Sequence, residues 1–154
     1  MSEYTAIVRW SRGQQDFIDN SYSRGHTWTF DGGLSVAASS SPDVVPLPMS
    51  VAEHVDPEEA FVASLSSCHM LFFLSLAAQR GIMVDEYTDA SVGFLEKDDN
   101  GNMAMTRVIL RPNCEYGTAL APDAETILRL HHRAHKLCFI ANSVKTEVVT
   151  EIIA

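Results

Sequence analysis

Apolar positions at the start of the chain are grouped in short segments rich in β-branched and aromatic residues. Segments 4–10, 27–30 and 34–39 are each predicted to be strands. Residues 31–33, Asp-Gly-Gly, lie between the last two and are typical of a turn, so those strands should form a hairpin. The proline- and serine-containing segment 39–55 follows and is interpreted as an ordered connection within one domain.

The pattern then changes to that of one long helix, predicted over residues 57–80. Asp56 is a good N-cap, Pro57 suits the first helical position, and Glu59 completes a capping-box pattern. Gly81 supplies the stop at the other end. The expected length is about 36 Å at about 1.5 Å per residue.

The second half is predicted to contain strands at 87–96 and 103–112, joined by the polar turn 97–102. A second helix is expected over 122–137 and a last strand over 146–153. The apolar side of that helix would comprise Ile127, Leu128, Leu130, Ala134 and Leu137. The order β-β-β-α-β-β-α-β, with mostly antiparallel hairpins, predicts an α+β fold in a single domain, 1–154.

The long helix raises the question of a membrane, because residues 60–78 carry no formal charge and are just long enough to span one. Four serines, Cys68 and His69 interrupt the segment, its start is acidic, and only Arg80 follows as a base. A helix of a soluble protein that is buried on most sides explains the pattern better, so no membrane partner is expected.

Composition and charge disfavour some classes of function. Apolar residues make up 46% of the 154 residues and charged residues 20%, which supports an ordinary core. The formal net charge of −9 disfavours binding to nucleic acid or anionic lipid. Three cysteines and no recognisable signal peptide favour a reducing compartment, and the cytoplasm is the expected location.

Cys68 is the first candidate for chemistry. An unpaired cysteine in an apolar helix is most often a small buried hydrophobe, whereas a reactive one needs an accessible, electropositive environment. His69 is rotated by about 100° from it on a helix, so the two side chains should not form a nucleophile–base pair. A buried, hydrogen-bonded His69 is the expected arrangement.

His131, His135 and Cys138 form a second candidate cluster. Their i, i+4, i+7 spacing places them on one helical face, which would suit a transition metal with Cys68 as a fourth ligand. The alternative is an ordinary solvated face carrying histidines. Cys114 is expected in a loop after a strand, with no assigned role.

Three stretches resemble the OsmC/Ohr family, named for osmotically inducible protein C and organic hydroperoxide resistance. In "DPEEAFVASLSSC", Glu58 and Cys68 match the family's Pro-Glu and first cysteine, ten residues apart. "AHKLCFIANSV" resembles the second-cysteine motif, with Cys138, and "SRGHTWTFDGG" the strand entry with a functional arginine, Arg24. Arg9 and Arg12 are nearby rivals for that arginine. Phe139 stands where the family often has proline, which marks a divergent branch.

The resemblance implies antiparallel sheets wrapped around a long central helix in an intertwined homodimer. It also implies a thiol-dependent peroxidase in which Cys68 attacks a peroxide and the resulting sulfenic acid forms a disulfide with Cys138. Arg24 would stabilise the thiolate and Glu58 would hold the guanidinium. No metal or cofactor is implied, only an external dithiol or protein thiol as reductant.

Spacing also favours active sites shared between two subunits. Glu58 and Cys68 should lie about 15 Å apart along one helix, so an arginine bridging both would have to reach far, whereas a two-fold partner helix could supply its own Glu58.

Met70, Phe72 and Phe73 are candidates to line an apolar pocket that favours organic peroxides. Two alternatives remain: a zinc-binding protein, and a protein that binds a small apolar ligand without turnover. The sequence leaves open the peroxide, the electron donor and the roles of His26, His69, His131, His132 and His135.

Overall fold

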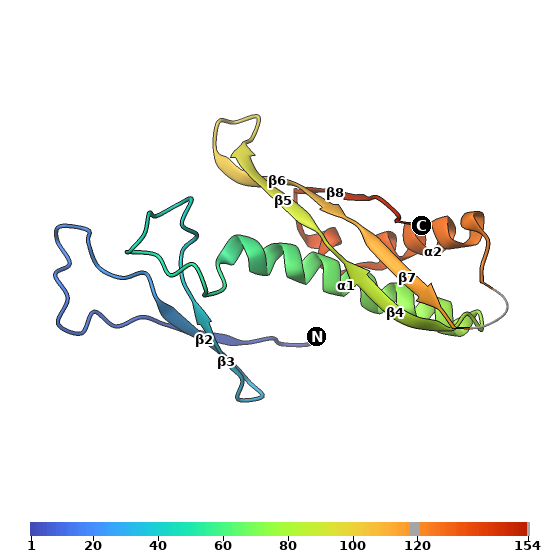
Figure 1. The fold of residues 1–154 in the computed structure, drawn as a ribbon, viewed down its shortest axis with the longest axis horizontal. Helices are drawn as coiled ribbons and strands as arrows, with labels where there is room; N and C mark the ends of the chain where they lie inside the picture. The colour runs from blue at the N-terminus through green and yellow to red at the C-terminus, as the bar shows by residue number, and fades with distance from the viewer. Residues whose placement is uncertain (118–120, 154) are drawn as a thin grey trace. The chain divides into compact units, whose positions relative to one another are not determined.

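In the computed structural model, which describes residues 1–117 and 121–153, the chain divides into two compact units, Met1–Ala60 and Phe61–Ala154. Figure 1 shows strands in both units, with helices α1 and α2. The first unit contains a sheet of three antiparallel strands, and the second contains one sheet of two strands and one of three. The predicted α+β class is confirmed.

The first unit is built on β1 (Ala6–Arg9), β2 (His26–Phe30) and β3 (Ser35–Ala38), in that order across the sheet. The predicted hairpin between β2 and β3 is present. Gly33 has a φ of +90°, a conformation that glycine adopts without steric cost. Its N–H donates to the carbonyl of Phe30 and closes the turn.

Helix α1 (Pro57–Gln79) begins and ends as its sequence predicts. The Glu59 N–H donates to Oδ1 of Asp56 at 2.8 Å, and the Asp56 N–H donates to Oε2 of Glu59 at 3.3 Å, which completes the capping box. Gly81, at a φ of +70°, lies just beyond the last turn.

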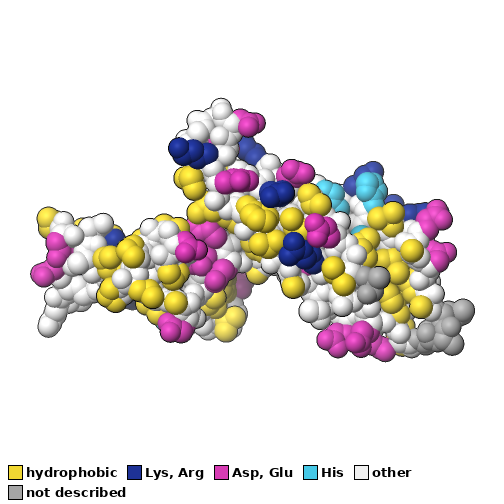
Figure 2. Space-filling model, turned by 45° about the horizontal axis from the view of Figure 1, so that its top comes forward, with side chains coloured by type: hydrophobic (Ala, Val, Ile, Leu, Met, Phe, Trp, Pro, Cys, Tyr) yellow, Lys and Arg dark blue, Asp and Glu magenta, His cyan; other side chains and the backbone are white. Residues whose placement is uncertain are grey.

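The expectation that this helix is buried on most sides is wrong for the single chain. Its buried residues are Leu65, His69, Phe73, Leu76 and Ala77. Leu71, in the middle of the helix, is 60% exposed. By length and composition α1 could cross a membrane, and only 28% of its most apolar window is buried. Hydrophobic side chains reach the surface elsewhere too, as the yellow areas of Figure 2 show.

The two strands predicted after α1 are each divided in two. The first becomes β4 (Val84–Asp89) and β5 (Val92–Lys97), and the second becomes β6 (Met103–Leu110) and β7 (Pro112–Tyr116). In Figure 1 the four strands form one long ribbon, with β4 beside β7 and β5 beside β6. The hairpin turn predicted between β5 and β6 is confirmed.

Asp89 marks the point where the ribbon divides. One oxygen of its carboxylate accepts the Arg111 backbone N–H at 2.6 Å, and the other accepts the Ser66 hydroxyl at 2.5 Å. A side chain thus satisfies a backbone donor at the break between the two ladders. Cys114 lies within β7, opposite Tyr87, so the prediction of a loop at that position is wrong.

Helix α2 (Ala124–Leu137) starts after the N-cap Asp123, whose side chain accepts the Thr126 N–H. Leu130 and Ala134 are buried as predicted and share one core cluster with Phe73, Leu76 and Ala77 of α1. Leu128 and Leu137 are 58% and 37% exposed, so placing them on the buried side was wrong. His131 lies buried on that side instead, because it has a hydrogen-bonding partner.

The chain closes with a 3₁₀ turn at Ala141–Ser143 and with β8 (Glu147–Thr150). Strand β8 pairs parallel with β6, so the second sheet of this unit has the order β5-β6-β8. The 3₁₀ turn directly follows the last turn of α2, where Cys138 lies.

Candidate active site

The second unit brings Cys68 and Cys138 side by side. Cys68 lies mid-way along α1 and is half-buried, and Cys138 is the C-cap of α2 and is 1% exposed. Both thiols are free. Seventy residues separate the two in the chain, so packing of α2 on α1 accounts for their proximity.

Hydrogen bonds at the end of α2 fix the position of Cys138. The Cys138 backbone N–H donates to the carbonyls of Ala134 and His135, and the Cys138 Sγ accepts the Ala141 N–H at 3.4 Å. Burial, followed by the adjacent Cys68 thiol, raises the pKa of Cys138 to about 11, and the Ala141 N–H opposes that rise. Cys138 is therefore a protonated thiol at neutral pH, which suits a resolving cysteine better than a first nucleophile.

Aromatic side chains accompany the cysteines on both segments. Phe72, four residues beyond Cys68 on α1, meets Phe139 edge to face with ring centroids 5.0 Å apart. Phe139 follows Cys138 directly and is 70% exposed, and Leu71 is also exposed. Phe73 is fully buried in the core, so its role as a pocket-lining residue is not supported. Phe139 was missed as a site residue, although its position beside Cys138 could have suggested it.

Histidines form a buried contact beside the cysteines. His69 and His131 are 1% and 2% exposed, and Nε2 of His69 lies 2.9 Å from Nδ1 of His131. The prediction that His69 is buried and hydrogen-bonded is confirmed. Burial, and next the nearby His135, lower the pKa of His69 to about 4, while Asp89 opposes the shift.

The described residues contain no group of three or more His, Cys, Asp or Glu side chains placed to hold a metal ion. His131 is hydrogen-bonded to His69, whereas the Cys138 side chain contacts Cys68. The zinc-binding alternative, built on His131, His135, Cys138 and Cys68, therefore has no ligand set here.

Arg24 and Glu58 lie in the first unit, where the structure places them in separate contacts. The Arg24 guanidinium donates to the Asn20 carbonyl at 3.1 Å and to Oδ1 of Asn20 at 2.9 Å. It also stacks on the Tyr22 ring, with Cζ 3.7 Å from the centroid. The ion pairs among the described residues are Arg111–Glu151 and Arg129–Glu125, and they include no Arg24–Glu58 pair.

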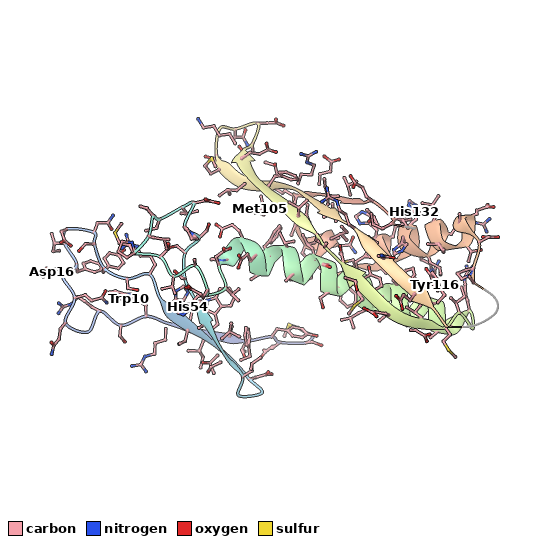
Figure 3. The ribbon with its side chains drawn as sticks, viewed as in Figure 1. Trp10, Asp16, His54, Met105, Tyr116 and His132 are labelled. Atoms are coloured by element: carbon pink, nitrogen blue, oxygen red, sulfur yellow. The ribbon has the colours of Figure 1, made fainter. Side chains whose placement is uncertain are left out.

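The loop that holds Arg24 is organised by aromatic packing. Trp10 contacts Phe17 and Tyr22, with ring centroids 5.8 Å and 5.3 Å away, and Phe17 stacks on Tyr22 at 4.7 Å. Figure 3 labels Trp10 and Asp16 in this part of the chain. The rival Arg12 donates to the Gln15 carbonyl at 3.0 Å, so it too bonds within the loop.

Comparison with known proteins identifies the family. A family model described as OsmC-like protein matches residues 51–153. The chain belongs to the OsmC-like family. It is 56% identical to an OsmC-like protein of unknown function from Vibrio cholerae, with a TM-score of 0.98, covering 99% of this chain and 100% of that one. No match was found among curated proteins.

Proteins of lower sequence identity share the fold. An organic hydroperoxide resistance protein of Bacillus subtilis, OhrB, is 19% identical, with a TM-score of 0.70 and coverage of 99% of this chain and 98% of that one. Its counterpart from Elizabethkingia anophelis is 16% identical, with a TM-score of 0.72 and coverage of 99% and 94%. The α+β fold of this chain is thus an OsmC-like fold.

Proposed function

We propose that this OsmC-like protein is a thiol-dependent peroxidase that reduces organic hydroperoxides. The observation that carries the proposal is the placement of two free cysteines, Cys68 and Cys138, side by side at the meeting of α1 and α2. The names of the Bacillus and Elizabethkingia relatives support the same substrate class. The apolar side chains of Phe72, Phe139 and Leu71 favour organic peroxides over hydrogen peroxide.

The proposed reaction has two steps on the protein. The Cys68 thiolate attacks the terminal peroxide oxygen, and an S–O bond forms as the O–O bond breaks. The organic fragment leaves as an alkoxide and becomes an alcohol by taking up a proton, which balances the proton lost when the thiolate formed. The Cys138 sulfur then attacks the Cys68 sulfur, an S–S bond forms as the S–O bond breaks, and water leaves with the Cys138 proton. Two electrons pass from the thiols to the peroxide.

An external dithiol or protein thiol would complete the cycle by thiol–disulfide exchange. No metal or organic cofactor takes part in this scheme. Exchange of this kind requires a reducing compartment, and the cytoplasm is the proposed location.

Intact mass spectrometry tests the proposal. The reduced protein is treated with one equivalent of cumene hydroperoxide, and its mass and free thiols are measured. We expect a loss of two mass units, one Cys68–Cys138 disulfide, and a remaining thiol on Cys114 of β7. Three persistent thiols would refute the peroxidase and leave binding of a small apolar ligand without turnover.

We also propose that the protein acts as a homodimer with shared active sites. The single chain exposes Leu71 of α1, and all four residues of β1 are exposed, with Ile7 and Val8 at 65% and 66%. A second copy would cover such apolar surface. Glu58 and Cys68 are ten residues apart on α1, about 15 Å along its axis, so a partner's Glu58 could serve this Cys68.

Subunit mixing tests the sharing of sites. Cys68→Ser and Glu58→Gln variants, each expected to be inactive as a homodimer, are unfolded together and refolded in equal amounts. If Glu58 serves the partner's Cys68, half of the dimers are mixed and each has one intact site, so about a quarter of wild-type activity returns.

If Glu58 serves its own Cys68, the mixed dimer has no intact site and activity stays at the level of the variants. That result, or full activity of Glu58→Gln alone, would contradict shared sites. Refolding each variant separately and then mixing the folded proteins provides the control for subunit exchange.

A further inference from the structure

A pair of buried imidazoles joins the two cysteine-bearing helices. His69 of α1 and His131 of α2 share one hydrogen bond of 2.9 Å, and their rings are parallel to within 4°, with centroids 5.2 Å apart. Phe73, one turn beyond His69, stacks on the His131 ring at 4.1 Å. The pair is therefore a polar link set in an apolar part of the interface between the helices.

The buried surroundings determine which nitrogen carries the proton. Nδ1 of His69 is buried and has no hydrogen-bonding partner among residues 1–117 and 121–153. A buried N–H without an acceptor costs more than a bare lone pair, so Nδ1 of His69 is the unprotonated nitrogen. Nε2 of His69 then donates to Nδ1 of His131, which fixes His131 as the acceptor.

This link adjoins Cys68 on α1 and lies two turns from Cys138 on α2. His69 follows Cys68 directly, and His131 precedes Cys138 by seven residues, two turns of α2. A disulfide requires its sulfurs at about 2.05 Å with a narrow range of dihedral angles, so small shifts of one helix along the other would slow closure. In the proposed cycle neither histidine takes part in the attack on the peroxide.

We propose that His69 and His131 are positioning residues for the resolving step, holding α1 and α2 so that the Cys138 sulfur can attack the Cys68 sulfenic acid and release water. This inference rests on the proposed two-cysteine cycle. The histidines supply no electrons and form no bond to sulfur; they act through the alignment of the two helices.

Three variants separate the hydrogen bond from packing. His131→Phe keeps a ring against Phe73 but leaves the His69 N–H without an acceptor. His131→Asn places an amide oxygen near the position of Nδ1 and keeps that acceptor. The double variant His69→Leu/His131→Phe removes both polar groups, which leaves no unpaired buried donor and should preserve stability better than His131→Phe.

The measurement is the fate of Cys68 after one equivalent of cumene hydroperoxide, in the presence of the sulfenic-acid trap dimedone. Loss of the Cys68 thiol should proceed at the wild-type rate in every variant. We expect disulfide closure to be about ten to a hundred times slower in His131→Phe and in the double variant, with dimedone-labelled Cys68 accumulating. His131→Asn should close within about threefold of the wild-type rate, because it keeps the acceptor.

His132→Gln is the matched control. His132, labelled in Figure 3, neighbours His131 on α2 but is exposed. It should behave as wild type. A folded double variant that closes at the wild-type rate would overturn the positioning role while leaving the peroxidase intact. A wild-type protein that forms no disulfide would instead overturn the two-cysteine cycle and the positioning role with it.

Discussion

Replacing Cys68 by serine should lower the rate of peroxide consumption at least about a thousandfold. A serine hydroxyl is far less nucleophilic than a thiolate at neutral pH and cannot form a sulfenic acid, so the first step is lost. The rate is measured with cumene hydroperoxide and excess dithiothreitol. The fold should be preserved, because Cys68 is half-buried and the substitution is small.

Cys138→Ser should give a different result because Cys138 acts only in the second step. One equivalent of peroxide should still be consumed rapidly, and the product should be a Cys68 sulfenic acid that dimedone labels. Turnover with a dithiol should then be slowed, since reductant must attack the sulfenic acid directly.

Cys114→Ser is the matched control for both variants, because Cys114 lies in β7 and takes no part in the proposed cycle. It should retain wild-type turnover. If Cys68→Ser kept substantial activity, or if Cys114→Ser lost it, the assignment of the nucleophile would be wrong. Equal rates of the first oxidation in wild type and Cys138→Ser would assign Cys68 as the nucleophile and Cys138 as the resolving thiol.

Acidification should destabilise the protein through the buried imidazole pair. The pKa values of His69 and His131 are lowered from 6.5 to about 4, chiefly by burial, with a smaller contribution from His135 for His69 and from His69 for His131. Asp89 opposes both shifts. As the pH falls, the two imidazoles therefore take up protons at a higher pH in the unfolded chain than in the folded chain.

The stability that the neutral imidazoles of His69 and His131 contribute is complete above about pH 6.5. It declines between pH 6.5 and pH 4 and is lost below that range. Between pH 7.5 and pH 5 the free energy of unfolding should fall by about 2 kcal/mol for each imidazole, up to about 4 kcal/mol for the pair. Urea unfolding followed by circular dichroism at several pH values measures this slope.

The double variant His69→Leu/His131→Phe should lose most of that slope, and His132→Gln should keep it, because His132 is exposed. A slope unchanged in the double variant would mean that other groups account for the acid sensitivity. Protein concentration must be constant across the series, since a dimer's stability depends on it.

Local sequence patterns predicted most elements of the fold. The capping box at Asp56 and Glu59, the stop at Gly81 and the turn at Gly33 depend on the backbone preferences of a few neighbouring residues, and all three are present. The division of the long ribbon at Asp89 could not be predicted in the same way. It depends on a bond from the Arg111 N–H, 22 residues away in the sequence.

The burial of α1 and α2 was predicted less well than their bounds. Leu128 and Leu137 fit an apolar stripe, yet they are exposed, whereas His131 is buried. Periodicity assigns a face by residue type, but a histidine can be buried when a partner satisfies its nitrogen. Here the partner, His69, belongs to another helix.

The sequence by itself determined the α+β class, the bounds of α1 and the residues on which the chemistry is proposed to depend, because these follow from local preferences and from residue-by-residue resemblance. The resemblance implied that Cys68 meets Cys138, and the tertiary structure places the two thiols together. Only the tertiary structure decided that His69 bonds to His131 and that Arg24 binds its own loop. These contacts form only after helices have packed together or a loop has closed. The backbone preferences of neighbouring residues do not predict them.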